Sequence, residues 1–119
     1  MKTAILASII VLSGCSAIPS FWDDNQSKVA IDIVADARQI NCEGDYKVQV
    51  KQLHRDVEWF ISYSQLKGTD DVLEMAVLVN NTVKPFAEKE ELSPAYCNLK
   101  KKIIIKQTEA MGRAVLRRY

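Results

Sequence analysis

The chain has 119 residues and a formal net charge of +1, so it is long enough for one small domain and nothing in it requires a second. Apolar residues make up 48% of it, with only four Gly and three Pro, which argues against a disordered tail and favours helices. The composition therefore predicts one ordered globular domain.

The charge is distributed unevenly along the chain. Residues 15–98 carry eight Lys and Arg against fourteen Asp and Glu, a net charge of −6, whereas residues 99–119 carry seven against one, a net charge of +6. A basic segment of this kind meets anionic lipid, nucleic acid or an acidic partner, or it pairs with the acidic part of its own chain. Because the two charges cancel, we keep self-pairing and an external anionic partner as equal alternatives.

A targeting segment opens the chain. Lys2 precedes an apolar run over residues 4–12, which falls short of the roughly twenty residues that a membrane-spanning helix needs. The run ends in Leu12-Ser13-Gly14-Cys15, which resembles the lipobox of small bacterial or phage-encoded lipoproteins. The resemblance implies a signal peptide over residues 1–14, cleavage before Cys15, and palmitate-type acylation of Cys15, with two or three acyl chains holding the protein stably at the membrane.

The same resemblance implies an address in the cell envelope. In enterobacterial lipoproteins an aspartate after the acylated cysteine retains the protein in the inner membrane, and this chain has Ser16 there. The resemblance therefore implies a lipid-anchored protein on the periplasmic face of the outer membrane, if the host is Gram-negative. Export of this kind argues against a nucleic-acid partner.

Residues 15–22 are interpreted as the lipidated N-terminus with a short tether, and residues 23–119 as the folded domain. The tether contains Pro19 and has no helical periodicity. Because an extended residue spans at most about 3.6 Å, the domain is expected to lie close to its membrane. Phe21 and Trp22 either close the membrane-side end of the core or lie in the lipid interface.

Two helices are predicted in the first half of the domain. The first is expected over residues 26–41, capped by Asp24 or Asn25 and stopped by Gly44, and the second over residues 45–67, ended by Gly68. Apolar residues in the second alternate at spacings of four and three, which is typical of a bundle seam. The apolar stripes are Val29, Ala30, Ile33, Ala37 and Ile40 in the first helix, and Tyr46, Val50, Leu53, Val57, Phe60 and Ser64 in the second.

Two further helices complete an all-α fold, a small up-down bundle of about four antiparallel helices. Thr69 and two aspartates predict a capped acidic start for the third, which is expected to end or kink near Pro85 because the residue before a proline avoids the helical region. Ser93 before Pro94 predicts the start of the fourth, which is expected to run to about Arg117. The inward faces are Val72, Leu73, Ala76, Val79 and Val83 in the third, and Cys97, Ile104, Thr108, Met111 and Val115 in the fourth, with Leu99, Ile103 and Ala114 beside them.

The cysteines predict one disulfide. With Cys15 assigned to lipid, Cys42 and Cys97 remain as an even pair in an exported chain. In an up-down bundle the end of the first helix and the first turn of the fourth share one end, which is an independent reason to pair them. Two unpaired buried thiols are the alternative, and a metal site is disfavoured because His54 lies half a helix away.

The same topology returns the C-terminus to the end of the bundle from which the lipidated N-terminus emerges. Arg113, Arg117 and Arg118 are therefore predicted to form a membrane-facing basic patch. Each exposed cation near an anionic surface adds up to about 1 kcal/mol of binding free energy. The alternative is that these residues only complement the carbonyl end of their helix.

No pattern in the chain indicates a reaction. His54 is predicted to be a surface residue, and the chain has neither a Gly-rich phosphate loop nor metal-ligand spacing. Trp59 and Tyr63 lie four residues apart, off the seam, and form either a binding ridge or part of a wide core face. We therefore expect no catalytic residue, cofactor or metal.

The function expected from these features is a non-enzymatic interaction module that binds an envelope protein. The alternatives are a phage-type lysis or spanin component, a superinfection-exclusion lipoprotein, or a small ligand carrier. A spanin subunit fits poorly because such subunits are typically proline-rich and this chain has three Pro. A carrier should retain a small molecule through purification, whereas an interaction module should not.

Overall fold

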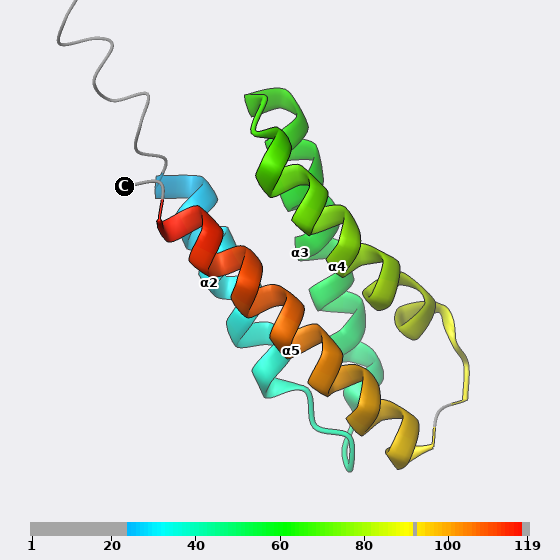
Figure 1. The fold of residues 1–119 in the computed structure, drawn as a ribbon. Helices are drawn as coiled ribbons and strands as arrows, with labels where there is room; N and C mark the ends of the chain where they lie inside the picture. The colour runs from blue at the N-terminus through cyan, green and yellow to red at the C-terminus, as the bar shows by residue number, and fades with distance from the viewer. Residues whose placement is uncertain (1–23, 92, 118–119) are drawn as a thin grey trace, which may run out of the picture.

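The structure is a computed structural model that describes residues 24–91 and 93–117. These residues form four helices without a strand (Figure 1). The helices are α2 (Asp24–Gln39), α3 (Tyr46–Lys67), α4 (Asp70–Glu88) and α5 (Pro94–Leu116). The predicted all-α fold is confirmed for this part of the chain.

Consecutive helices run in opposite directions, and α5 closes the bundle against α2 (Figure 1). α2 packs against α3 and α5, and α4 packs against the same two helices, whereas the Cα atoms of the diagonal pairs all lie more than 8 Å apart within the described ranges. The start of α2 and the end of α5 lie at one end of the bundle (Figure 1). This is the predicted up-down topology.

One stripe from each helix forms the core, and these stripes follow the predicted seams. Burying a large apolar side chain contributes about 1.5–3 kcal/mol, so the eighteen buried apolar residues are the main source of stability. The α3 seam is buried from Val50 to Ser64, with Tyr46 packed against its edge. The buried stripes of the other helices include Ala30, Ile33 and Ala37 on α2, Val72, Ala76, Val79, Val83 and Phe86 on α4, and Cys97, Ile104, Met111 and Val115 on α5.

The predicted helix ends at Gly68 and Ser93 are confirmed. Gly68 has a left-handed backbone (φ 78°), which suits glycine, and its N–H donates to the carbonyls of Ser64 and Gln65. The Ser93 hydroxyl accepts a hydrogen bond from the backbone N–H of Tyr96 at 3.2 Å, ahead of a proline in the first helical turn.

Thr69 precedes α4 as predicted but does not cap it with its side chain. Instead, Gln26 Nε2 donates to Thr69 Oγ1 at 2.9 Å, and Gln26 is buried. The turn between α3 and α4 is thereby connected to the start of α2.

The expected end of α4 near Pro85 is wrong, because the helix continues to Glu88. Pro85 has no N–H to donate to the carbonyl of Asn81, which weakens the helix at this point. Phe86, the next residue, is only 1% exposed and its ring lies 6.4 Å from that of Tyr46 and 6.1 Å from that of Tyr96. The burial of Phe86 offsets the missing hydrogen bond, and a rule based on local sequence does not include that burial.

Candidate functional site

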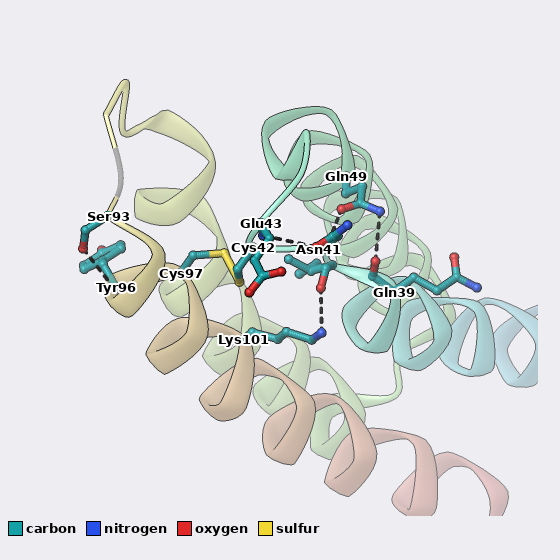
Figure 2. The surroundings of a disulfide bond; sticks show 10 residues. Gln39, Asn41, Cys42, Glu43, Gln49, Ser93, Tyr96, Cys97 and Lys101 are labelled. Carbon is teal, nitrogen blue, oxygen red and sulfur yellow. Dashed lines mark hydrogen bonds between the residues drawn. A yellow bond between two sulfur atoms is a disulfide. The ribbon is translucent and has the colours of Figure 1, made fainter.

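The disulfide links the loop after α2 to the first turn of α5 (Figure 2). The Cα atoms of Cys42 and Cys97 lie 5.6 Å apart, across a sequence separation of 55 residues, and both residues are buried. The predicted pairing is confirmed, and the alternative of two free thiols is not. The bridge therefore joins the first of the four described helices to the last one, at one end of the bundle.

The loop that carries Cys42 is also held by side chains (Figure 2). Lys101 Nζ donates to the Ile40 carbonyl at 2.6 Å, and Gln49 accepts from the Asn41 N–H at 2.8 Å while donating to the Gln39 carbonyl at 2.9 Å. Two of these bonds satisfy the Gln39 and Ile40 carbonyls at the C-terminal end of α2, where a cation such as Lys101 is favourable. The sequence analysis missed this role of Lys101, since its partner lies 61 residues away and only packing brings them together.

The predicted membrane-facing basic patch is only partly visible in the structure. Arg113 is exposed and its Nη2 lies 3.2 Å from Glu109 Oε2, while Glu109 Oε1 lies 3.1 Å from Arg38 Nη2 on α2. Arg117 is exposed and directly follows α5. The end of α5 lies beside the start of α2 (Figure 1). Arg118, like Cys15, lies outside the described residues.

The outer side of α5 combines cations with apolar residues. Its exposed side chains include no carboxylate, and Glu109, the helix's one carboxylate, is partly buried between two arginines. The exposed cations are Lys102, Lys106, Arg113 and Arg117, and the exposed large apolar residues are Leu99, Ile103 and Leu116. The prediction that Leu99 and Ile103 lie beside the inward face is wrong, since they are 57% and 37% exposed.

One ion pair joins α5 to another helix, between Glu109 and Arg38. In this pair the acid belongs to the basic part of the chain and the cation to the acidic part.

Trp59, Tyr63 and Leu66 form a stripe on the outer side of α3, which we call the aromatic ridge; Trp59 and Leu66 are exposed and Tyr63 is half-buried. Trp59 is 49% exposed and stacks on Tyr63, with ring centroids 5.1 Å apart and an interplanar angle of 14°. Leu66, one turn further on, is 91% exposed. The sequence left two interpretations of Trp59 and Tyr63, a ridge or part of a wide core face. The exposure of Trp59 favours the ridge.

A groove between α2 and α3 borders this ridge. It has a volume of about 250 Å³ and is lined by Val29, Asp32, Asp56 and Trp59. A second groove of about 210 Å³ runs between α2 and α5, lined by Ile31, Val34 and Leu116 and by the charged residues Arg38, Glu109 and Arg113. Both grooves are open to solvent.

His54 is not a surface residue, contrary to the prediction. Its side chain is 18% exposed, with Nδ1 3.1 Å from Asn80 Oδ1 on α4 and Nε2 2.6 Å from Glu58 Oε1. Both ring nitrogens are thus occupied, and His54 connects α3 to α4. The spacing of four residues between His54 and Glu58 was a signal in the sequence for half of this arrangement.

Asp36 forms an acidic pair with Asp56 across the boundary between α2 and α3, which sequence reasoning did not detect. Burial raises the pKa of Asp36, and a hydrogen bond with Asp56 together with the negative charges of Asp56 and Asp32 raises it further, to about 7. Asp36 Oδ2 is buried without a hydrogen-bond partner, while Asp56 Oδ1 accepts from Gln52 Nε2 at 3.0 Å. Asp36 therefore takes up a proton close to neutral pH.

The stability of the protein is expected to fall as pH rises from about 4 to 7, and Asp36→Asn is expected to remove most of that fall. The folded-state pKa of about 7 lies above the ordinary value of 3.8, so the folded state binds more protons than the unfolded state between these values. Solvent screening at a partly exposed carboxyl limits the loss to about 1 kcal/mol. Urea unfolding at pH 5 and pH 8 measures it.

Glu43→Gln, an exposed loop substitution, is the control and should keep the wild-type pH dependence. At pH 8 the Asp36→Asn variant should be more stable than the wild type, because no charge is buried there. A variant that keeps the wild-type slope between pH 5 and 8 would contradict this assignment.

Two further observations concern metal binding and membrane spanning. Within residues 24–91 and 93–117, His, Cys, Asp and Glu side chains do not gather in a group of three that could bind a metal ion. None of the helices in those ranges is both long and apolar enough to traverse a bilayer.

Comparison of the chain with protein-family models, with curated proteins and with solved structures finds no match.

Proposed function

We propose that this protein is a lipid-anchored envelope protein whose helical bundle binds another envelope protein without catalysing a reaction. The aromatic ridge carries the interaction part of the proposal. Tryptophan and tyrosine are enriched in protein interfaces, where a rigid aromatic surface is buried at a small entropic cost. A Trp that is 49% exposed and stacked on Tyr63 offers such a surface already ordered.

The groove beside the aromatic ridge places charged side chains along one edge of the ridge. Asp32 and Asp56 line this groove together with Trp59. An apolar centre with charged groups at its edge is the usual composition of a protein interface. A partner with an apolar anchor flanked by Lys or Arg is therefore the chemistry that this site fits.

The anchor part of the proposal rests on Leu12-Ser13-Gly14-Cys15. Cys42 and Cys97 are joined in the bridge, so Cys15 is the one cysteine of the sequence that remains for acylation. A diacylglycerol with a further acyl chain would hold the protein at the membrane stably, whereas a single chain would not. Ser16 favours the outer membrane and hence its periplasmic face.

The topology supports an orientation relative to that membrane. Nine peptide bonds separate Cys15 from Asp24, which limits the distance between these two residues to about 32 Å. The end of the bundle that contains the start of α2 and the end of α5 therefore faces the lipid (Figure 1), and Arg117 directly follows α5. We propose that Arg113, Arg117 and Arg118 meet anionic headgroups there.

One experiment on the full-length protein in intact bacterial cells tests both parts of the proposal. Wild type, Cys15→Ala and Trp59→Ala are compared by palmitate labelling, membrane fractionation and chemical cross-linking followed by mass spectrometry. Wild type should be labelled, membrane-bound and cross-linked to one envelope protein. Cys15→Ala should lose the label and retain the 14-residue signal peptide, because acylation precedes cleavage.

Trp59→Ala should keep the label and the membrane location but lose the specific cross-link, since its change lies on the ridge alone. Lys51→Glu, an exposed α3 substitution away from the ridge, is the matched control and should behave as wild type. Label that persists in Cys15→Ala would refute the anchor. Cross-links unchanged in Trp59→Ala would refute the ridge as the binding site.

A further inference from the structure

Helices α4 and α5 are neighbours with opposite surface charge. The exposed residues of α4 include four carboxylates and one lysine, whereas those of α5 include three cations and no carboxylate, with the exposed Arg117 directly after the helix. The exposed charges of α4 are Asp70, Asp71, Glu74, Lys84 and Glu88, and those of α5 are Lys102, Lys106 and Arg113. One side of the bundle thus presents an acidic strip next to a basic one.

Contacts within the bundle show which residues lie on that side. Asn80 of α4 contacts His54 on α3, and Leu78, two residues earlier and so about 200° around the helix, lies on the side toward α5. By the same argument Lys101 of α5 contacts the loop after α2, and Ile103 lies toward α4. Glu74, Leu99 and Lys106 each lie about one turn from these two residues. We call Glu74, Leu78, Leu99, Ile103 and Lys106 the α4–α5 face.

The α4–α5 face leaves apolar area in water. Leu78 is 56% exposed, Leu99 is 57% exposed and Ile103 is 37% exposed. Glu74 and Lys106 are also exposed, and they form no ion pair with each other within one molecule. The face therefore has both unburied apolar residues and charges of opposite sign available for a second surface.

The two strips are also matched in height along the bundle. The ring contact between Phe86 and Tyr96 places these two residues at one level. At about 1.5 Å per residue, Glu74 lies about 18 Å above that level and Lys106 about 15 Å above it. Leu78 and Ile103 lie about 12 Å and 10 Å above it.

We propose that the α4–α5 face is the interface of a homodimer whose two-fold axis runs parallel to the helices. Rotation about such an axis exchanges left and right without changing height, so α4 of each copy meets α5 of the other. Glu74 then faces Lys106 of the second copy, and Leu78 faces its Ile103, twice in each dimer. In a two-fold interface every contact between two different residues occurs twice, as these two contacts do.

Charge and size favour a second copy as the partner. The acidic strip on α4 is complementary in charge to the basic strip on α5, and both strips belong to the same chain. Two helices of this length present a face of about 28 by 20 Å, or about 1,100 Å² for both copies together, just above the roughly 1,000 Å² expected of a specific interface. The starts of α2 remain at one end of the dimer, which is compatible with two anchors in one membrane.

Charge exchange in the full-length protein tests the dimer. Wild type, Glu74→Lys, Lys106→Glu and the double variant are extracted in mild detergent, and their protein mass is measured by sedimentation over a range of concentrations. Each single variant should dissociate at least about tenfold more readily, because it places like charges opposite each other twice. The double variant should regain the wild-type constant within about threefold, and salt should weaken the wild-type dimer.

Lys51→Glu, an exposed substitution on α3 outside the α4–α5 face, is the matched control and should leave the dimer unchanged. Thermal unfolding followed by circular dichroism checks that every variant is folded, and a photo-reactive residue in place of Ile103 should give a homodimer in intact cells. A wild type that stays monomeric at about 100 µM overturns the proposal, as does a double variant no tighter than the singles. The α4–α5 face excludes Cys15, so Cys15→Ala should dimerise too, and a failed anchor remains distinguishable from a failed dimer.

Discussion

Removal of the Cys42–Cys97 bridge is expected to lower the free energy of unfolding by about 4 kcal/mol. The bridge spans 55 residues, and freeing a loop of that length raises the conformational entropy of the unfolded chain by this amount in the loop-closure description. Native domains of this kind are stable by about 5–15 kcal/mol, so the loss is a large share of the total. Urea unfolding of Cys42→Ala/Cys97→Ala against the oxidised wild type measures it.

The double variant is preferable to either single variant, because one remaining thiol could form a new disulfide with another chain. Reduced wild type should unfold at the same urea concentration as the double variant. The dependence of the unfolding free energy on urea should also steepen, since an unbridged chain exposes more surface when it unfolds. A loss below about 1 kcal/mol would show that the bridge does not constrain the unfolded chain.

Phe86→Ala is expected to destabilise the bundle by about 3–5 kcal/mol, the usual cost of truncating a buried phenylalanine. Phe86 is 1% exposed and packs between Tyr46 and Tyr96. Its loss should be felt most in the last turn of α4, where Pro85 has already removed a backbone hydrogen bond. Urea unfolding gives the cost, and amide hydrogen exchange of residues 86–89 locates it.

Phe86→Leu is the control, since a smaller change of apolar volume usually costs less than about 1.5 kcal/mol. The last turn of α4 should remain protected from exchange in that variant. If Phe86→Ala and Phe86→Leu cost the same, or if exchange at residues 86–89 is unchanged, the burial of Phe86 is not what extends α4 past Pro85.

Sequence reasoning succeeded where the physical cause is local. Helical stripes repeat within a few residues, so the α3 seam from Val50 to Ser64 could be recognised before any neighbour was known. Gly68 and Ser93 act within one turn of the chain and were predicted for the same reason. The pairing of Cys42 with Cys97 followed once four antiparallel helices were assumed, because the topology sets which helix ends meet.

The candidate sites were predicted less completely than the fold. Trp59 and Tyr63 were recognised as lying off the seam, yet periodicity alone left both a core face and a ridge open. The basic residues of α5 were noted as a patch, but the sequence showed neither the pairing of Arg113 with Glu109 nor the exposure of Leu99. Cys15 and the lipobox remain predictions from the sequence, because they lie outside the described residues.

The sequence by itself determined the helices, most of their ends and the face that each turns inward, since these depend on neighbours three or four residues away. Only the tertiary structure decided which polar groups meet across helices: Lys101 with the Ile40 carbonyl, His54 with Asn80, and Asp36 with Asp56. Such pairs depend on how far each helix is rotated and shifted against its neighbours. All four apolar stripes set that rotation and shift together when they pack, so no single segment of the chain contains the information.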